Sequence, residues 1–275
     1  MRYVSLTSWS LNRLLGPLYW SKWNQQKKDI ETFIDEQPEI HSLLDLPALL
    51  AEKGFQAMEI IHPHVPSTDT EYLKKLHKAT QKAGIRFYNL LIDYGDITNE
   101  DPVRRKRDMD FIKSWIDIAS KVGAENVRVI GGDAKPDDKK ALQLAALQLM
   151  ELCAYAKKKG VGVLTENFHS LTSTSENCLF LYEQTDITGL ISDFGNFSGP
   201  SKFQSLSETI PNSTSIHVKA LSNKDGSINK SELLQCLDLV EQANYDGPLT
   251  IVYDGPNDMW QGIEEVKEIV QRYII

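Results

Sequence analysis

Four helix-like segments of this chain end in the same way, with a lysine, a glycine within the next two residues, and then a short apolar run. The glycines are Gly54, Gly84, Gly123 and Gly160. A glycine just past a helix adopts the left-handed backbone conformation without a Cβ clash, and the lysine complements the negative end of the helix dipole. With Gly189 included, successive glycines are 29 to 39 residues apart, about the length of one strand-helix unit. The repeat predicts alternating strands and helices.

Hydrophobic periodicity between these stops predicts eight strands and eight helices. In residues 110–122 and 141–159, for example, apolar residues recur on one helical face. The expected strands are 3–7, 57–61, 86–91, 126–130, 162–165, 188–192, 213–218 and 248–252. The expected helices are 42–53, 70–82, 102–122, 137–159, 175–185, 203–209, 230–243 and 260–274.

Eight strand-helix units in 275 residues predict an α/β fold with one domain over residues 1–275, a (β/α)8 TIM barrel. The alternative is a doubly wound parallel sheet, which typically places a glycine-rich phosphate loop after its first strand. Here the first strand is followed by Ser8, Trp9, Ser10 and Leu11, with no G-x-G-x-x-G pattern. The barrel is therefore the favoured fold.

The segment from residue 11 to 41 departs from the repeat. It contains Trp20 and Trp23 but no strong apolar period. We expect it to lie over the barrel mouth as a lid between the first strand and the first helix. A peripheral structural excursion is supported equally well, because long connections of either kind occur in compact domains.

Composition excludes several classes of protein. A hydrophobic share of 41% and a net charge of −8 argue against a disordered chain and against nucleic-acid binding, which needs a basic surface. No apolar run reaches the ~18 residues of a membrane span, and residues 1–7 lack the pattern of a secretory signal. Three scattered cysteines form no disulfide framework or zinc cluster. We therefore expect a cytoplasmic protein without membrane contact, and we leave homo-oligomers open.

The residues just past each expected strand carry the chemistry in a barrel of this kind. Glu166 and Asp193 follow two successive strands, and His217 is the second-last residue of the next one, so their side chains are expected to converge near the barrel axis. Two carboxylates and one imidazole suit a divalent ion such as Mn²⁺, Mg²⁺, Co²⁺ or Zn²⁺. These three residues are the predicted metal ligands.

Four strings after the later strands resemble the sugar phosphate isomerase/epimerase family of the xylose isomerase-like superfamily. They are Thr165-Glu166-Asn167, Ser192-Asp193-Phe194-Gly195-Asn196, Ile216-His217-Val218-Lys219 and Val252-Tyr253-Asp254-Gly255-Pro256. The resemblance spans essentially the whole chain and implies a metal held by Glu, Asp, His and a second Glu. The first three ligands correspond to Glu166, Asp193 and His217.

The chain departs from the family pattern at three positions. The fourth ligand position holds Val252, a histidine that usually contacts substrate is replaced by Asn196, and the acid of the family's His-x-Lys-Asp is replaced by Ala220. In the epimerase members two glutamates serve as the proton acceptor and donor, so Val252 leaves Glu166 without its opposite partner. Asp254 lies two residues further, on the same side of the strand and about 7 Å nearer the mouth.

The resemblance and the strand-end positions together give the remaining candidates. Glu166 and Asp254 are the expected catalytic residues. The expected substrate contacts are Trp9, His62, His169, Asn196 and Lys219. We also expect His169 and Asn167 to orient Glu166, and we favour a structural or substrate-contact role for His62 and His64 over a second metal.

The leading functional hypothesis is a sugar isomerase or epimerase that acts on a small polyhydroxylated keto or aldo compound by metal-assisted enolisation. A one-base isomerisation or dehydration tolerates the loss of the second glutamate better than a two-base epimerisation. The alternative is a catalytically degraded barrel that binds a sugar-like ligand without turnover, with a weak or absent metal. The DNA-repair branch of the superfamily is disfavoured, because the chain has six histidines and a net charge of −8.

Overall fold

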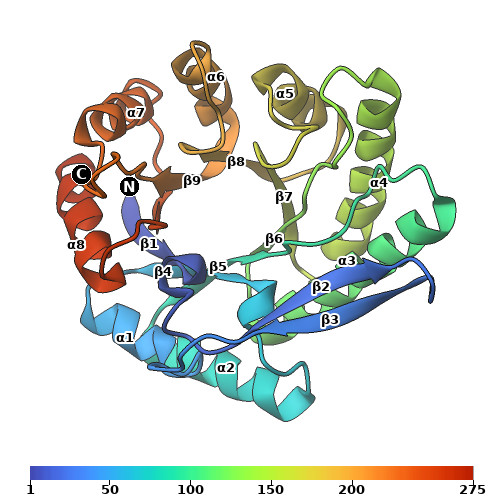
Figure 1. The fold of residues 1–275 in the computed structure, drawn as a ribbon, viewed down its shortest axis with the longest axis horizontal. Helices are drawn as coiled ribbons and strands as arrows, with labels where there is room; N and C mark the ends of the chain where they lie inside the picture. Colours follow the sequence, from blue (N-terminus) through green and yellow to red (C-terminus); the bar gives the residue numbers. More distant parts are fainter. Residues whose placement is uncertain (275) are drawn as a thin grey trace.

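The computed structural model describes residues 1–274 and contains a closed barrel of eight parallel strands (Figure 1). Around the barrel the strands follow the order β1, β10, β9, β8, β7, β6, β5, β4. Their bounds are β1 (Tyr3–Thr7), β4 (Ala57–Ile61), β5 (Arg86–Leu91), β6 (Asn126–Arg128), β7 (Gly162–Glu166), β8 (Gly189–Asp193), β9 (Ser213–Lys219) and β10 (Pro248–Val252). The predicted (β/α)8 barrel is confirmed.

Eight α-helices pack around the barrel within the described residues (Figure 1). They are α1 (Leu46–Glu52), α2 (Thr70–Ala83), α3 (Pro102–Val122), α4 (Lys139–Lys157), α5 (Ser175–Gln184), α6 (Lys202–Thr209), α7 (Lys230–Gln242) and α8 (Met259–Val270). There are also four short 3-10 turns, η1 (Ser8–Leu11), η2 (His62–His64), η3 (Ile210–Asn212) and η4 (Gln271–Tyr273), within the described residues. Over residues 1–274 no helix is both long and apolar enough to cross a membrane.

Two helix boundaries differ from the sequence prediction by more than two residues. Helix α1 begins at Leu46 rather than at residue 42, because Pro47 occupies its first turn, where the fixed φ and the missing N–H of proline are tolerated. Helix α8 ends at Val270, and η4 replaces the expected last α-helical turn. Tightening of a final turn into a 3-10 helix is common at helix ends.

The four predicted helix stops have the expected backbone geometry. Gly54, Gly84, Gly123 and Gly160 have φ values of +77°, +67°, +75° and +71°, in the left-handed region. Gly189 serves a different purpose, because it begins β8, and an added Cβ there would lie 2.4 Å from the Thr214 side chain. Four of these glycines therefore end helices, whereas Gly189 allows β8 to pack closely against Thr214.

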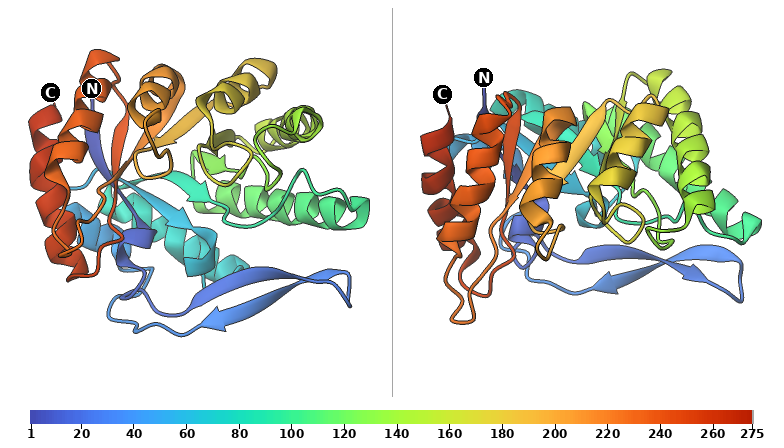
Figure 2. Two further views of the ribbon diagram at one scale, coloured as in Figure 1. Left: turned by 45° about the horizontal axis from the view of Figure 1, so that its top comes forward. Right: turned by 90° about the horizontal axis from the view of Figure 1, so that it is seen from above.

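The segment 11–41 contains a β-hairpin that the sequence analysis missed. Strands β2 (Leu18–Asn24) and β3 (Asp29–Asp35) pair in antiparallel register. Figure 2 shows the hairpin running across the end of the barrel where the strands finish. The segment that we expected as a lid or a peripheral excursion is thus a β-hairpin, a structure that its sequence pattern did not predict.

The hairpin is anchored on the barrel mouth by apolar side chains. Leu18 is buried in a cluster at the strand ends, and Trp9 and Trp20 pack against the same cluster, whose other members are Ile61, Leu91, Leu164 and Ile191. The rings of Trp9 and Trp20 meet edge to face, with centroids 6.3 Å apart. The movement of this hairpin as a lid stays a prediction.

The left-handed backbone at Gly84 gives a direct test of the repeated helix stop. Gly84→Ala should lower the free energy of unfolding by about 1 kcal/mol, because a Cβ in left-handed backbone costs about 1–2 kcal/mol and no neighbour obstructs it. Gly84→Asn should lose less, since asparagine tolerates this conformation better. Urea denaturation of the three proteins measures the difference. An alanine variant as stable as the parent would contradict the account.

Candidate functional site

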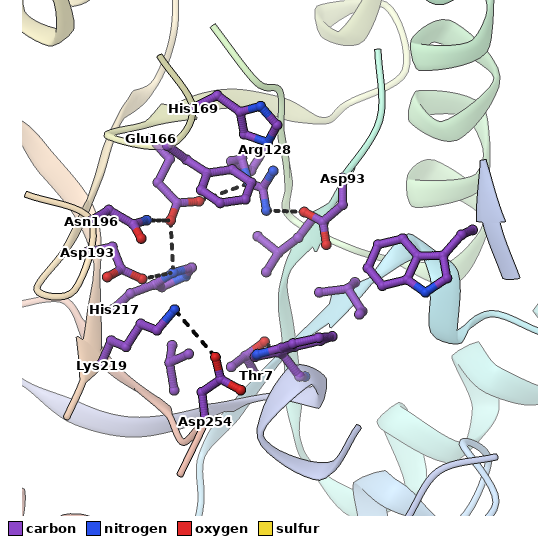
Figure 3. A pocket seen from close by; sticks show the side chains of 16 residues that line it. Thr7, Asp93, Arg128, Glu166, His169, Asp193, Asn196, His217, Lys219 and Asp254 are labelled. Atoms are coloured by element: carbon purple, nitrogen blue, oxygen red, sulfur yellow. Dashed lines mark hydrogen bonds and ion pairs between the residues drawn. The ribbon is translucent and has the colours of Figure 1, made fainter. Parts of the chain in front are cut away.

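A cavity of about 410 Å³ opens at the carboxyl ends of the barrel strands (Figure 3). One part of its wall is polar and charged, and another is apolar. The polar lining consists of Thr7, Asp93, Arg128, Glu166, His169, Asp193, Asn196, His217, Lys219 and Asp254. The apolar lining consists of Trp9, Trp20, Ile61, Leu91, Phe168 and Val252. The volume of the cavity lies within the range of small-molecule binding sites.

The three predicted metal ligands meet at one point of this cavity. Glu166 ends β7, Asp193 ends β8 and His217 lies near the end of β9, so adjacent strands deliver them to one height. A potential ligand atom of each lies within 4.8 Å of the others. His217 Nδ1 is 3.4 Å from Glu166 Oε1 and 3.5 Å from Asp193 Oδ2. Figure 3 shows the side chains pointing toward one another.

The opposite edge of the His217 ring contacts a carboxylate that the sequence analysis missed. Glu59, on β4 across the barrel interior, lies with Oε2 2.9 Å from His217 Nε2. Its other oxygen accepts hydrogen bonds from Ser215 Oγ at 2.7 Å and from Thr250 Oγ1 at 2.8 Å. Glu59 is fully buried. These contacts commit Nε2–H to Glu59 and direct Nδ1 toward Glu166 and Asp193.

Charge in this cluster changes the proton affinity of both partners. Burial disfavours a charged His217, but the carboxylates of Glu59 and Glu166 outweigh burial and hold the pKa of His217 well above its usual value. Burial likewise disfavours a charged Glu59, but His217 and the two hydroxyl donors lower the pKa of Glu59 below its usual value. Without a bound cation, the pair is therefore an imidazolium and a carboxylate.

The donor set fits one divalent cation. Asp193 Oδ1 accepts the Gly195 N–H at 2.6 Å, so the other oxygen, Oδ2, is the one beside His217. A histidine ligand whose second ring nitrogen donates to a carboxylate is the usual arrangement at metal sites, because this bond fixes the ring. Two carboxylates and an imidazole suit Mn²⁺, Mg²⁺, Co²⁺ or Zn²⁺. A cation bound through Nδ1 would displace the His217 proton.

The fourth ligand position of the resembled family is apolar here. Val252 ends β10, lines the cavity and is 5% exposed. Asp254 lines the same cavity further along the chain, and its Oδ2 lies 3.8 Å from Lys219 Nζ. Asp254 is thus paired with a lysine at the wall, and Val252 offers no donor to the cluster.

A buried arginine also belongs to the site. Arg128, the last residue of β6, has Nε 3.0 Å from Glu166 Oε2, and its guanidinium pairs with Asp93 and covers the Phe168 ring. Asn196 donates to the other oxygen of Glu166 at 3.0 Å. Both oxygens of Glu166 are therefore engaged. The sequence does contain a signal for this role, because Arg128 is the one charged residue in the otherwise apolar stretch from Val127 to Ile130.

The structure corrects two of the expected roles near Glu166. Asn167 bonds to Asp193 instead, donating to the Asp193 carbonyl at 3.0 Å and accepting the Asp193 N–H at 2.7 Å. His169 lines the cavity, but its Nδ1 lies 2.6 Å from Asp133 Oδ1 rather than on Glu166. Arg128 and Asn196 orient Glu166 in their place.

His62 is the one expected substrate contact that does not line the cavity. Its buried ring packs edge to face against Phe111 and Trp115, and its Nδ1 accepts the Asp93 N–H at 2.9 Å. The substrate role expected for His62 is therefore corrected to a structural one. Trp9, His169, Asn196 and Lys219 all line the cavity, as does the expected catalytic Asp254.

Comparison with known proteins gives a family for this barrel. The family model described as Xylose isomerase-like TIM barrel matches residues 47–271. The chain belongs to this family. Its membership agrees with the resemblance carried by the strand-end strings, and it covers the strands that supply Glu166, Asp193 and His217.

Solved structures of family-like barrels share the fold at low sequence identity. An L-ribulose 3-epimerase is 14% identical with a TM-score of 0.73, over 100% of this chain and 95% of that one. A probable 3-DHS dehydratase from Bacillus anthracis is 17% identical with a TM-score of 0.71, over 99% and 100%. A xylose isomerase-like barrel from Mycobacterium smegmatis in complex with magnesium is 14% identical with a TM-score of 0.64, over 99% and 98%. A search of curated proteins found no significant match.

The buried histidine His64 predicts a pH dependence of stability. Burial lowers the pKa of His64 to about 3, whereas an unfolded histidine titrates near 6.5. Below pH ~6.5 the unfolded chain binds a proton at His64 that the folded chain does not bind. The free energy of unfolding therefore decreases as the pH is lowered. Between pH 7.5 and 5.0 this costs about 2 kcal/mol.

Urea denaturation of the parent and His64→Asn at both pH values measures this contribution. The variant should lose about 2 kcal/mol less than the parent over the interval. Asparagine keeps a side-chain group near Ser8, whose Oγ lies 2.8 Å from His64 Nδ1. The same pH dependence in both proteins would contradict the burial of a neutral imidazole.

Proposed function

We propose that this chain is a metal-dependent enzyme of the sugar isomerase/epimerase type. The substrate class is a small polyhydroxylated aldehyde or ketone, and the reaction moves a proton at the carbon next to the carbonyl. The observation that carries the proposal is the convergence of Glu166, Asp193 and His217 within 4.8 Å on the wall of a 410 Å³ cavity. Family membership and the epimerases among its structural neighbours support the same reaction class.

Each part of the site has a definite task in this proposal. Asp193, Glu166 and His217 Nδ1 hold the cation, and Glu59 keeps His217 in position. The cation supplies electrostatic stabilisation of negative charge that develops on the carbonyl oxygen. Trp9 and Trp20 form an apolar wall suited to the C–H face of a sugar, and they exclude water from the reacting carbon.

The site favours a one-base reaction over a two-base epimerisation. Two-base proton transfer needs groups on both faces of the reacting carbon, and Val252 replaces the glutamate of the second face. Isomerisation between an aldose and a ketose, or dehydration, needs one base for the carbon-bound proton. We therefore place this chain with those reactions within the family.

A second candidate function is ligand binding without turnover. Val252 at the fourth position and the ion pair between Arg128 and Glu166 favour it, because both reduce the chemistry available to Glu166. Proton exchange separates the candidates. With Mn²⁺ in D₂O, an enzyme incorporates deuterium next to the carbonyl of ketoses such as D-fructose, D-tagatose and L-ribulose. A binder retains the proton while saturating with the ligand.

Location and partners are also part of the proposal. We place the chain in the cytoplasm, where its three cysteines, all free and buried, meet a reducing environment. The proposed partner is the small sugar-like substrate, with or without a phosphate, because Lys219 can neutralise an anionic group at the wall.

Mn²⁺ titration by calorimetry tests the metal site. Glu166→Ala should weaken Mn²⁺ binding by about 100-fold, because it removes one of three protein ligands and one negative charge. Glu183→Ala on the exposed face of α5 is the matched control and should bind as the parent does. A parent that binds no Mn²⁺, or an alanine variant that binds equally well, would contradict the proposed site.

Val252→Glu tests whether the missing ligand limits the affinity for the metal. Because Val252 lines the cavity, the added carboxylate should face the cluster and tighten Mn²⁺ binding by about tenfold. Val252→Gln supplies the same size without the charge and should gain much less. Equal or weaker binding by the glutamate variant would show that the wall no longer admits a fourth ligand.

A further inference from the structure

A second histidine lies at the rim of the same cavity and is paired with its own carboxylate. His169 follows β7, and Asp133 follows β6, the neighbouring strand. His169 Nδ1 lies 2.6 Å from Asp133 Oδ1, and the side chain of His169 is 37% exposed. Figure 3 shows His169 on the side of the cluster opposite to the Lys219 and Asp254 pair. None of the predicted metal ligands contacts this dyad through a hydrogen bond within the described residues.

The loop that carries His169 is held in an unfavourable backbone conformation. His169 has φ +67°, in the left-handed region that non-glycine residues rarely adopt. The Thr172 hydroxyl donates to the Phe168 carbonyl at 2.7 Å, and Leu171 N–H donates to the Gly132 carbonyl at 3.3 Å. These bonds fix the loop against the chain around Asp133. Backbone strain of this kind persists where the surroundings enforce it, and it clusters at functional sites.

The metal cluster itself lacks a free base. Glu166 is held between Arg128, whose Nε lies 3.0 Å from Oε2, and Asn196, which donates to Oε1 at 3.0 Å. The chain has six histidines, all within residues 1–274. Of these, only His169 and His217 line the cavity. Both ring nitrogens of His217 are already committed. His169 is therefore the imidazole that remains available to a substrate.

Asp133 prepares His169 for proton transfer. An acceptor at Nδ1 selects the tautomer with Nδ1–H and leaves the lone pair of Nε2 free. The hydrogen bond with His169 holds the pKa of Asp133 below its usual value although the group is partly buried. The backbone N–H of Asp133 donates a hydrogen bond to Asp96 Oδ1 at 3.3 Å. The carboxylate is thus anionic and anchored.

We propose that His169 is the catalytic base of this site and that Asp133 is its positioning residue. This inference rests on the proposed function. The C–H bond next to the substrate carbonyl breaks, its electron pair passes into the enolate, and the proton moves to His169 Nε2. The imidazolium that results is paired with Asp133. The hydroxyl proton on the first carbon passes to the former carbonyl oxygen, and a new carbonyl forms at that first carbon as the proton returns from Nε2 to the former carbonyl carbon. His169 is then neutral again, and the one-base isomerisation is complete.

The test compares His169→Gln, Asp133→Asn and the loop control Ser170→Ala in Mn²⁺-loaded protein. Deuterium incorporation from D₂O into D-fructose, D-tagatose and L-ribulose is followed by ¹H NMR. His169→Gln should slow exchange by about 100-fold or more, the usual contribution of a general base. Its Mn²⁺ affinity should stay within about twofold of the parent, since His169 is not a ligand. Ser170→Ala should match the parent in both measurements.

Asp133→Asn tests the positioning role by its effect on the tautomer. An asparagine amide can donate to Nδ1 and stabilise the opposite tautomer, so exchange should slow by about tenfold or more. ¹⁵N NMR of the histidine ring, assigned by the signal lost in His169→Gln, should show Nδ1–H in the parent and a change in Asp133→Asn. A change of tautomer without slower exchange would indicate a structural pair and would overturn the positioning role.

The outcomes separate the two proposals. Parent-like exchange in His169→Gln would overturn the role of His169 while leaving the metal-dependent reaction intact. A parent that binds Mn²⁺ but exchanges none of the three ketoses would count against the proposed function. The ¹⁵N spectrum of the His169 ring then tests the proposed pairing with Asp133 independently of activity. An Nε2–H tautomer in the parent would overturn that pairing.

Discussion

The hydrogen-bonded pair of Glu59 and His217 crosses the barrel interior and determines the site above it. The two residues belong to β4 and β9, which are separated by β1 and β10 in the barrel order, so the contact depends on barrel closure. Both side chains are buried, and Ser215 and Thr250 satisfy the second oxygen of Glu59. Removing one partner of such a pair leaves a buried charge and typically costs about 3–5 kcal/mol. The barrel therefore fixes the direction in which His217 Nδ1 points, and with it the position of any bound cation.

Charge balance explains the composition of the layer around His217. Glu59, Glu166, Asp193 and Asp93 place four carboxylates near the barrel mouth, and Arg128 is the permanent cation among them. A raised pKa of His217 adds a second positive charge when no cation is bound. A divalent ion supplies more charge than the proton that it displaces, so it compensates the carboxylates better. In the proposed mechanism the ion pair with Arg128 keeps Glu166 as a metal ligand, and His169, outside the cluster, transfers the proton.

The sequence predicted the parts of this structure that depend on local patterns. Helix stops such as Gly84 and the residues at the ends of β7, β8 and β9 follow from periodicity and backbone preference, and they located the three proposed ligands. Glu59 and Arg128 were missed, because their roles come from contacts across the barrel and between strands, which no local pattern contains. The β2–β3 hairpin was missed because its apolar residues do not alternate regularly with polar ones, and some of them, such as Phe33 and Ile34, are exposed. His62 was misassigned because a histidine after a strand can face the cavity or the helices behind it.

We propose that the barrel presents Glu166, Asp193 and His217 Nδ1 to a single divalent cation while Glu59 holds His217 Nε2. Anomalous diffraction from crystals soaked in Mn²⁺ tests it directly. We expect one strong peak at ~2.0–2.6 Å from an oxygen of Glu166, an oxygen of Asp193 and Nδ1 of His217, with the Glu59 contact retained. A crystal that shows no peak at this cluster, or a peak reached by His217 Nε2 after its ring has turned away from Glu59, would contradict the account.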